Sequence, residues 1–138
     1  MPNTQDGVVE TSLRVRYAET DAMGVVYHAN YLIWFEAGRG DYFRAFGQDY
    51  GAWEKDGYFL PVVELHARYL APARYGDTVT VRTWIKGARS RSVTLGYEAA
   101  LAETGQLLAT GWTQHLCTDA EGNTRRLPEE LRQLPPHD

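Results

Sequence analysis

Apolar and polar residues alternate in four segments of the second half of the chain, and this period of two is typical of β-strands. The segments cover residues 63–69, 79–85, 93–101 and 107–117, of which the last is apolar on both faces. A shorter alternation at residues 13–17 predicts one more strand before them. Hairpin-like turns containing glycine or proline follow three of the four segments, at residues 71–77, 103–106 and 119–123. The first ten residues are expected to be flexible.

A helix is predicted from His28 to Phe46, because apolar residues recur there at helical spacing. Further apolar residues widen this surface, and a helix that is apolar on most faces is a buried one. The residues concerned are Leu32, Phe35, Tyr42, Phe43 and Phe46, with Ile33, Trp34 and Ala37 around the other side. Gly38 and Gly40 each cost about 1 kcal/mol relative to alanine inside a helix. They indicate either the close approach of another backbone or a break in the helix.

One long helix followed by antiparallel strands describes an α+β fold in which the sheet wraps around the helix. The 138 residues fall within the range of one domain, and no repeat or linker divides them. Residues 49–57 form a short polar connection, and residues 128–134 predict a short helical turn that two prolines end. We therefore expect a single domain over residues 1–138.

Composition narrows the class of protein. Hydrophobic residues make up 43% of the chain and charged residues 23%, close to ordinary soluble usage. There is no apolar run of about 18 residues and no leader-like start, so we expect a cytoplasmic protein without a membrane span. The single cysteine, Cys117, excludes an intrachain disulfide. The net charge of −4 argues against a nucleic-acid partner.

The candidate chemistry lies in the turn before the long helix. Asp21 precedes His28 by seven residues, and His28 stands where the first helical N–H groups have no intrahelical partner. Acyl transfer uses such a pair: a carboxylate that attacks or activates water, and N–H donors that stabilise the oxyanion. The plain alternative for Asp21 is an Asx-turn residue that bonds its own backbone.

The same stretch resembles a known family. Residues Tyr17 to Tyr31 fit the pattern Y-x-x-T-D-x-x-G-V-V-Y-H-x-x-Y without a gap, and residues 61–77, PVVELHARYLAPARYGD, fit the strand and turn that follow. This pattern is similar to that of the hotdog-fold acyl-CoA thioesterases, in particular the 4-hydroxybenzoyl-CoA thioesterase family and its Tol–Pal-associated branch. The resemblance covers residues 12–127, the expected core of the domain.

The resemblance implies a hotdog fold whose sheets pair edge to edge into a dimer, with further association to a homotetramer. It implies hydrolysis of a small acyl-CoA to the free acid and CoA, without a metal and with no cofactor beyond the CoA of the substrate. Two alternatives stay open: a hotdog protein that binds acyl-CoA without turnover, and a thioesterase acting on acyl carrier protein. Ala22 stands where the founding enzymes have proline, which argues against an aromatic acyl group.

By the same resemblance, Asp21 is the nucleophile or the general base, two roles that sequence does not separate. His28 is assigned a backbone N–H that binds the oxyanion, with a side-chain general acid or a solvated helix start as alternatives. Asn30 is expected to orient the loop. The full set of candidate substrate-binding residues, for each of which ordinary packing is the alternative, is Tyr17, Gly24, Tyr27, Asn30, Tyr31, Trp34 and Val63.

The phosphates of CoA require cations, and Lys86, Arg89 and Arg91 cluster in the KGARSR turn between two predicted strands. An ordinary solvated turn is the alternative. Glu36 is read as an ion-pair partner of Arg39 and is left out of the catalytic set.

Rival chemistries have less support. The four histidines, His28, His66, His115 and His137, show no metal-ligand spacing. Cys117 and His115 share a strand face in an apolar context, which favours a buried inert thiol over a nucleophile and base pair. No G-x-S-x-G serine motif is present.

Overall fold

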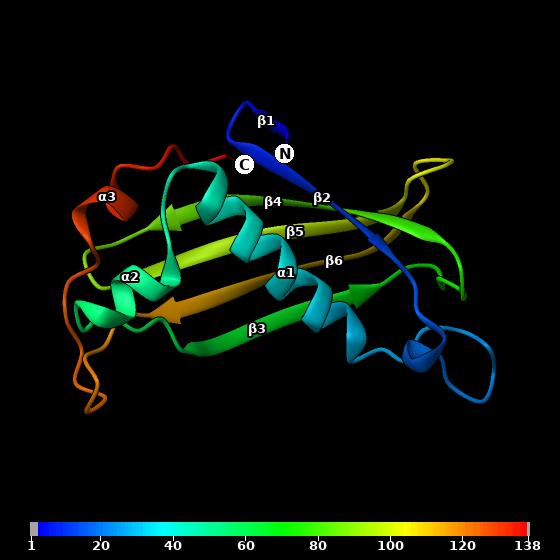
Figure 1. Cartoon of the computed structure of the whole chain (residues 1–138), viewed down its shortest axis with the longest axis horizontal. Coiled ribbons are helices and arrows are strands. Elements are labelled where there is room, and N and C mark those ends of the chain that lie inside the picture. The colour runs from blue at the N-terminus through cyan, green and yellow to red at the C-terminus, as the bar shows by residue number, and fades with distance from the viewer. Residues whose placement is uncertain (1–2, 138) are drawn as a thin grey trace.

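The computed structural model describes residues 3–137 and is shown in Figure 1. Its strands are β1 (Asn3–Gln5), β2 (Val8–Arg14), β3 (Val62–Tyr69), β4 (Thr78–Ala88), β5 (Ser92–Leu101) and β6 (Leu107–Leu116). Its helices are the 3-10 turn η1 (Tyr17–Glu19) and α1 (Asn30–Ala45), α2 (Tyr50–Lys55) and α3 (Glu129–Arg132). The four predicted strands of the second half, the long helix and the C-terminal helical turn are confirmed.

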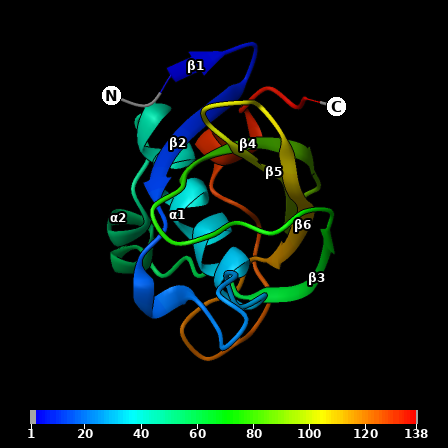
Figure 2. The same ribbon diagram turned by 90° about the vertical axis from the view of Figure 1, so that its right-hand side faces the viewer.

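The strands form one antiparallel sheet in the order β1-β2-β4-β5-β6-β3. The sheet curls around α1, which lies along its concave face, as the end view in Figure 2 shows. This is the hotdog arrangement that the sequence predicts. It places the start of α1, the η1 turn and the loop after β3 together at one end of the sheet (Figure 1).

The core lies between α1 and the sheet. Alternate residues of β4 and β5 are buried, as a period of two requires when one face packs on a helix. Phe35 of α1 stacks on Tyr97 of β5 with ring centroids 4.6 Å apart and planes 9° apart. Aromatic contacts of this kind add to the area that each ring buries.

Gly38 lets α1 approach β4 closely. A Cβ at Gly38 would lie 2.5 Å from Thr83 Oγ1 and 2.9 Å from Val81 Cγ1, so any larger residue would push the helix off the sheet. A Cβ at Gly40 would meet only the flexible end of Arg44. The predicted close approach is therefore found at Gly38, against side chains of β4, and α1 continues unbroken through both glycines.

Four expectations about local structure are wrong. Residues 3–10 include β1 and the start of β2, where Val8 and Val9 are buried against the sheet; residues 1–2 lie outside the described part. The 13–17 alternation ends early, because Tyr17 begins η1 and is exposed. Residues 49–57 contain α2. Helix α1 is buried on one face only, and Ile33 is 56% exposed.

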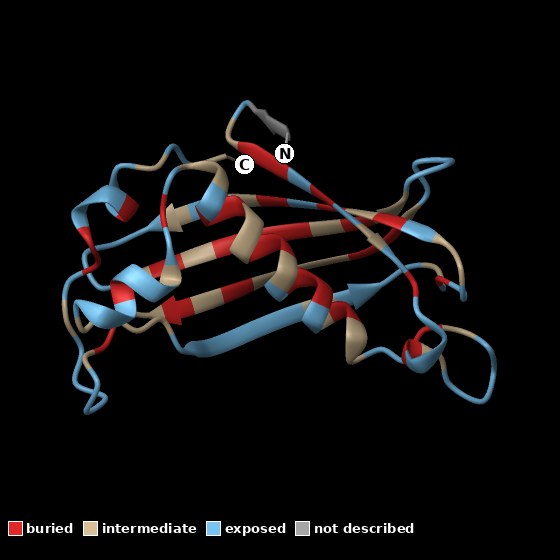
Figure 3. Cartoon of the chain, in the orientation of Figure 1, coloured by how far each residue is buried: buried red, intermediate tan, exposed pale blue. Residues whose placement is uncertain are grey.

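Strand β3 is exposed along nearly its whole length, in contrast to the neighbouring strands (Figure 3). It lies at the edge of the sheet and pairs only with β6. Val63, Leu65 and Tyr69 are between 44% and 55% exposed on it. An apolar edge with unpaired backbone groups is a surface that proteins normally cover. In residues 3–137, no helix is long and apolar enough to cross a membrane.

Candidate active site

Asp21 sits in a tight turn closed by the bridge between Thr20 and Val26. Its N–H donates to the Val25 carbonyl at 2.8 Å, and its carbonyl accepts from the Gly24 N–H at 3.0 Å. Gly24 adopts φ +79°, a left-handed conformation that favours glycine. Gly24, which the sequence predicts as a substrate-binding residue, shapes the turn that holds Asp21 in this structure.

Asp21 is exposed, and one of its two carboxylate oxygens accepts a hydrogen bond. Its Oδ1 accepts the Met23 N–H at 2.8 Å, which is the Asx-turn bond anticipated as the plain alternative. Within residues 3–137, Oδ2 has no hydrogen-bond partner. The turn therefore fixes the direction of the carboxylate and leaves one oxygen free to act on a ligand.

The start of α1 offers N–H donors from the two residues that precede its first helical residue, Asn30. In the described part of the chain, no acceptor is bonded to the N–H of His28 or of Ala29, and the N-cap residue Ala29 provides no side-chain cap. The His28 carbonyl, in contrast, accepts from the Tyr31 N–H at 3.3 Å and from Tyr69 Oη at 2.9 Å. An uncapped helix start of this kind attracts negative charge.

A pocket of about 320 Å³ opens beside these donors. It is lined by Val26, His28, Tyr31, Tyr69, Leu70, Ala71 and Pro72. Of the predicted substrate-binding residues, Tyr31 lines this pocket, and Tyr27 borders it by packing its ring on His28 at 4.4 Å. The pocket is mostly apolar with few polar groups, which is usual for small-molecule sites.

The walls of this pocket are tied to the Asp21 turn. The Val26 N–H donates to the Ala73 carbonyl at 2.9 Å, and the Ala73 N–H donates to Tyr31 Oη at 3.2 Å. Val25 also bridges to Arg74. The Asp21 turn, the start of α1 and the loop after β3 thus form one connected unit.

Glu19 is a buried acidic residue next to the candidate site that the sequence analysis did not single out. Glu19 is 5% exposed, and its carboxylate accepts from the Arg16 N–H at 2.8 Å and from Trp34 Nε1 at 3.0 Å. Burial alone raises the pKa of Glu19. The hydrogen bonds from Arg16 and Trp34 and the nearby Arg16 guanidinium lower it by more than burial raises it, so the pKa lies below its usual range. Glu19 is therefore held as a buried anion two residues before Asp21.

The backbone of Glu19 also organises the turn. Its carbonyl accepts from the Tyr27 N–H at 2.8 Å and from Asn30 Nδ2 at 2.9 Å. The expected loop-orienting role of Asn30 has this bond as its structural basis. The sequence signal for Glu19 was its place three residues after Arg16, the spacing at which a glutamate can accept the N–H of the residue that precedes a helical turn, as Glu19 does at η1.

Three other predicted substrate-binding residues lie outside the pocket. Trp34 is buried, its ring centroid lies 4.7 Å from that of Tyr31, and its indole N–H donates to Glu19. Val63 is 55% exposed on the free edge β3. Tyr17 is 77% exposed and meets Tyr75 edge to face at 5.8 Å.

The predicted phosphate cluster is distant within one chain. Lys86 near the end of β4 and Arg89 and Arg91 in the turn to β5 are exposed. The Asp21 turn bridges to Arg74, just before the start of β4, and η1 lies at the opposite end of the sheet from the β4–β5 turn (Figure 1). The eleven residues of β4 span about 35 Å. A ligand held at Asp21 would have to cross the length of the sheet to touch these cations, so this contact requires a second copy of the chain.

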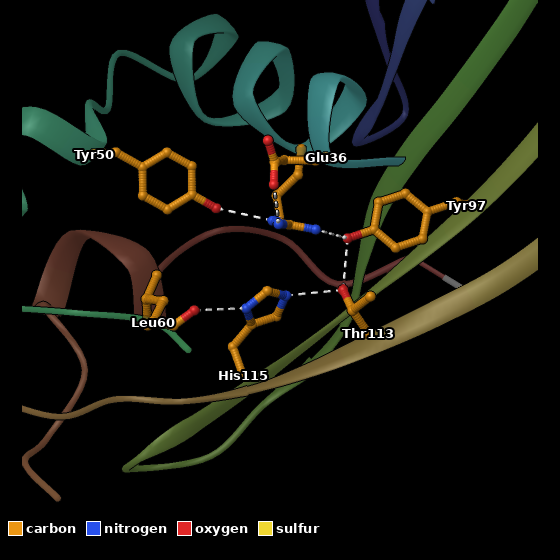
Figure 4. Close-up of polar contacts among 7 residues, drawn as sticks. Glu36, Tyr50, Leu60, Tyr97, Thr113 and His115 are labelled. Atoms are coloured by element: carbon orange, nitrogen blue, oxygen red, sulfur yellow. Dashed lines mark hydrogen bonds and ion pairs between the residues drawn. The ribbon is translucent and has the colours of Figure 1, made fainter. Parts of the chain in front are cut away.

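A second polar cluster is buried between α1 and the sheet (Figure 4). Arg39 donates from Nε to Tyr50 Oη at 3.0 Å and from Nη1 to Tyr97 Oη at 3.1 Å, and its Nη2 lies 3.9 Å from Glu36 Oε2. The ion pair with Glu36 was predicted. The burial of Arg39 was not, because a helical arginine near a glutamate is normally solvated.

Hydrogen bonds continue from Tyr97 to Thr113 Oγ1 at 2.6 Å, from Thr113 to His115 Nε2 at 2.8 Å, and from His115 Nδ1 to the Leu60 carbonyl at 2.9 Å. Arginine only donates and a carbonyl only accepts, so a neutral His115 fixes the direction of every bond. Burial lowers the pKa of His115 to about 4, with a smaller contribution from Arg39. This chain of bonds ties α1 and α2 to the sheet.

Cys117 is fully buried, and burial raises the pKa of its thiol. His115 bonds Thr113 and Leu60 instead of the thiol, which confirms the buried thiol and leaves the nucleophile and base pair without support. Among the described residues, no three His, Cys, Asp or Glu side chains gather as metal ligands would.

Known proteins resemble this chain in sequence and structure. The sequence model of the thioesterase-like superfamily matches residues 15–134. The putative acyl-CoA thioesterase YneP of Bacillus subtilis is 40% identical over 114 residues, which are 83% of this chain and 82% of that protein. The match to the superfamily model covers the Asp21 turn, α1 and strands β3 to β6.

Solved structures agree with the sequence relatives. A hypothetical protein of Thermus thermophilus has a TM-score of 0.83 and 42% identity, over 91% of this chain and 95% of that one. The DHNA-CoA thioesterase of Staphylococcus aureus has a TM-score of 0.83 and 37% identity, over 87% of this chain and 80% of that one. With the hotdog sheet, the Asp21 turn and these matches in place, the chain belongs to the thioesterase-like superfamily.

Proposed function

We propose that this protein is an acyl-CoA thioesterase that hydrolyses the thioester bond of a small acyl-CoA to the free acid and CoA. The observation that carries the proposal is the pair of unbonded N–H groups at His28 and Ala29, beside a pocket of about 320 Å³ and next to the Asp21 turn. The activity named for the Bacillus subtilis and Staphylococcus aureus relatives supports it.

The reaction starts with the thioester carbonyl against the start of α1. The free oxygen of Asp21 either attacks the carbonyl carbon or removes a proton from an attacking water. The carbonyl oxygen becomes an oxyanion, and the N–H of His28 stabilises it together with the positive end of the helix dipole. Collapse of the tetrahedral intermediate breaks the C–S bond and releases CoA as the thiolate, which takes up a proton from solvent. If water attacked, the free acid is formed at this point. If Asp21 attacked, a mixed anhydride remains, and a water molecule hydrolyses it to the free acid and the Asp21 carboxylate. No step requires a metal.

The acyl group lies in the pocket lined by Tyr31 and Tyr69 in this proposal. Those rings could pack on an aromatic or an aliphatic acyl group. Ala22, which follows the proposed catalytic aspartate, argues against an aromatic group. The similar DHNA-CoA thioesterase argues for one. The test is release of free thiol from a panel of acyl-CoA esters that runs from acetyl to aromatic groups. Turnover identifies the acyl class, and binding without turnover of any ester would instead favour an acyl-CoA-binding protein.

The site is proposed to work in a dimer formed along β3, with further pairing to a tetramer. Tyr69 of that strand lines the pocket and bonds the His28 carbonyl, so a partner on the β3 edge would lie beside the site. The exposed apolar side chains of β3 support such pairing. A cytoplasmic location and the choice between CoA and acyl carrier protein stay predictions.

A further inference from the structure

A second cleft lies on the far side of the loop that follows β3. It measures about 480 Å³, and its lining includes Arg14, Arg16, Tyr17 and Tyr75. The two tyrosine rings are 77% and 65% exposed and meet edge to face. Large aromatic surfaces are seldom left uncovered side by side, and an exposed pair beside a cleft marks a binding surface.

The cleft is also cationic, in a chain with a net charge of −4. Among the described residues, Arg14 forms no ion pair, and Arg16 reaches only Glu19, at 3.6 Å, with most of its guanidinium in solvent. Asp77, the acid closest in sequence to Tyr75, uses Oδ2 to accept the Arg74 N–H. Aromatic rings beside exposed guanidinium groups suit a ligand that joins a flat base to phosphates.

The cleft and the proposed active site share one loop. Ala71 and Pro72 line the pocket beside His28, whereas Tyr75 and Gly76 line the cationic cleft. The five residue steps from Ala71 to Gly76 span at most about 17 Å even when extended. The flexible pantetheine arm of CoA is long enough to join a thioester at the first pocket to a nucleotide at the second.

We propose that this cleft binds the 3′-phosphorylated adenosine diphosphate end of CoA. The adenine packs on Tyr17 and Tyr75, and the phosphates bond to Arg14 and Arg16. This inference rests on the proposed function for its choice of CoA as the carrier of the acyl group. It places the phosphate-binding cations near Asp21 within one chain. The cluster at Lys86, Arg89 and Arg91 lies at the other end of the sheet and could reach the site only from a second copy.

The test compares an acyl-CoA with the acyl-pantetheine that carries the same acyl group and lacks the nucleotide. Arg14→Ala raises the KM for acyl-CoA about tenfold, the expected scale of a lost charge-assisted bond, and changes kcat less than about twofold. Tyr75→Ala has a similar effect through lost stacking. Neither variant alters kcat/KM for acyl-pantetheine. Arg132→Ala, an exposed arginine on α3, is the matched control and behaves as wild type on both substrates.

Calorimetric titration with 3′,5′-ADP measures the same site without catalysis. Wild type binds the nucleotide, and Arg14→Ala binds it about tenfold more weakly. Equal losses on both thioesters, or no change on either, would overturn the nucleotide subsite and leave the thioesterase intact. If wild type hydrolyses no thioester, the proposed function fails, and the titration alone decides the cleft: absence of 3′,5′-ADP binding rejects it.

Discussion

Trp34 donates its indole N–H to Glu19 Oε2 at 3.0 Å, and this bond fastens the long helix α1 to the turn that presents Asp21. The same carboxylate accepts the Arg16 N–H, and the Glu19 carbonyl accepts from Tyr27 and Asn30. A single buried residue thereby sets the position of the proposed catalytic aspartate relative to the start of α1.

Glu19→Gln tests this positioning role. The amide keeps one acceptor oxygen but turns an N–H₂ group toward a donor, so one buried bond is lost at a cost of about 1–3 kcal/mol. We expect a lower free energy of unfolding and a reduced kcat, measured by urea denaturation and thiol release. Glu103→Gln, an exposed change in the turn after β5, is the control. Wild-type stability and kcat in Glu19→Gln would contradict the role.

Acid should remove the stabilisation that the ionised Glu19 carboxylate provides. The folded pKa of Glu19 lies below its unfolded value, so its stabilisation is present above the unfolded pKa and is lost as the pH falls through the folded one. Urea denaturation of wild type and Glu19→Gln between pH 6 and pH 3 measures this effect. The difference in stability between the two proteins should shrink with acid, and a constant difference would argue against a buried Glu19 anion.

His115 should make the free energy of unfolding depend on pH in a second, higher pH range. Its folded pKa of about 4 lies below the usual 6.5, so the unfolded chain binds the extra proton first and stability falls as the pH drops below 6.5. Between pH 7.5 and pH 5 the loss should be about 2 kcal/mol. His115→Gln removes this slope, whereas His66→Gln on exposed β3 serves as the matched control. A wild-type slope in His115→Gln would show that His115 is not the titrating group.

His28→Ala separates the two roles proposed for His28. The substitution keeps the backbone N–H, so an oxyanion site at that N–H predicts a decrease in kcat of less than about tenfold. A side-chain general acid predicts a loss of about a hundredfold or more. Steady-state thiol release decides between these outcomes, with circular dichroism to confirm that α1 still forms.

The exposed edge of β3 predicts assembly. Leu65→Glu should shift the protein toward monomer, because it places a charge where the apolar β3 edges of two copies would pack against each other. Light scattering after size exclusion measures the mass, and Ala102→Glu in the turn after β5 is the control. A wild-type mass for Leu65→Glu would exclude pairing along this strand.

Much of the fold follows from local pattern. The period of two at β3–β6 and the helical spacing in α1 each report a face that packs on the core, so these elements are readable from sequence. The start of β2 is not, because the pairing of Val8 and Val9 with β4 residues gives that segment its structure. Helix α2 has too few apolar positions to show a period.

The candidate site divides in the same way. Asp21 and His28 could be chosen as candidates from the sequence because they stand seven positions apart in one continuous motif. Glu19 is not, since a lone glutamate is usually solvated and only its contacts with Trp34 and Arg16 reveal burial. The distance from Asp21 to Arg91 is equally hidden, because it depends on which end of the sheet each turn occupies.

The most direct test of the central claim is thiol release by wild type and Asp21→Asn, assayed in parallel on the preferred acyl-CoA. Asparagine keeps the Oδ1 acceptor for the Met23 N–H, and residue 21 is exposed, so the thermal midpoint should stay within about 2 °C. Asp56→Asn, at the exposed end of α2, controls for the loss of a charge. The account predicts that kcat falls at least about a hundredfold in Asp21→Asn alone. A folded Asp21→Asn protein with wild-type kcat would contradict it.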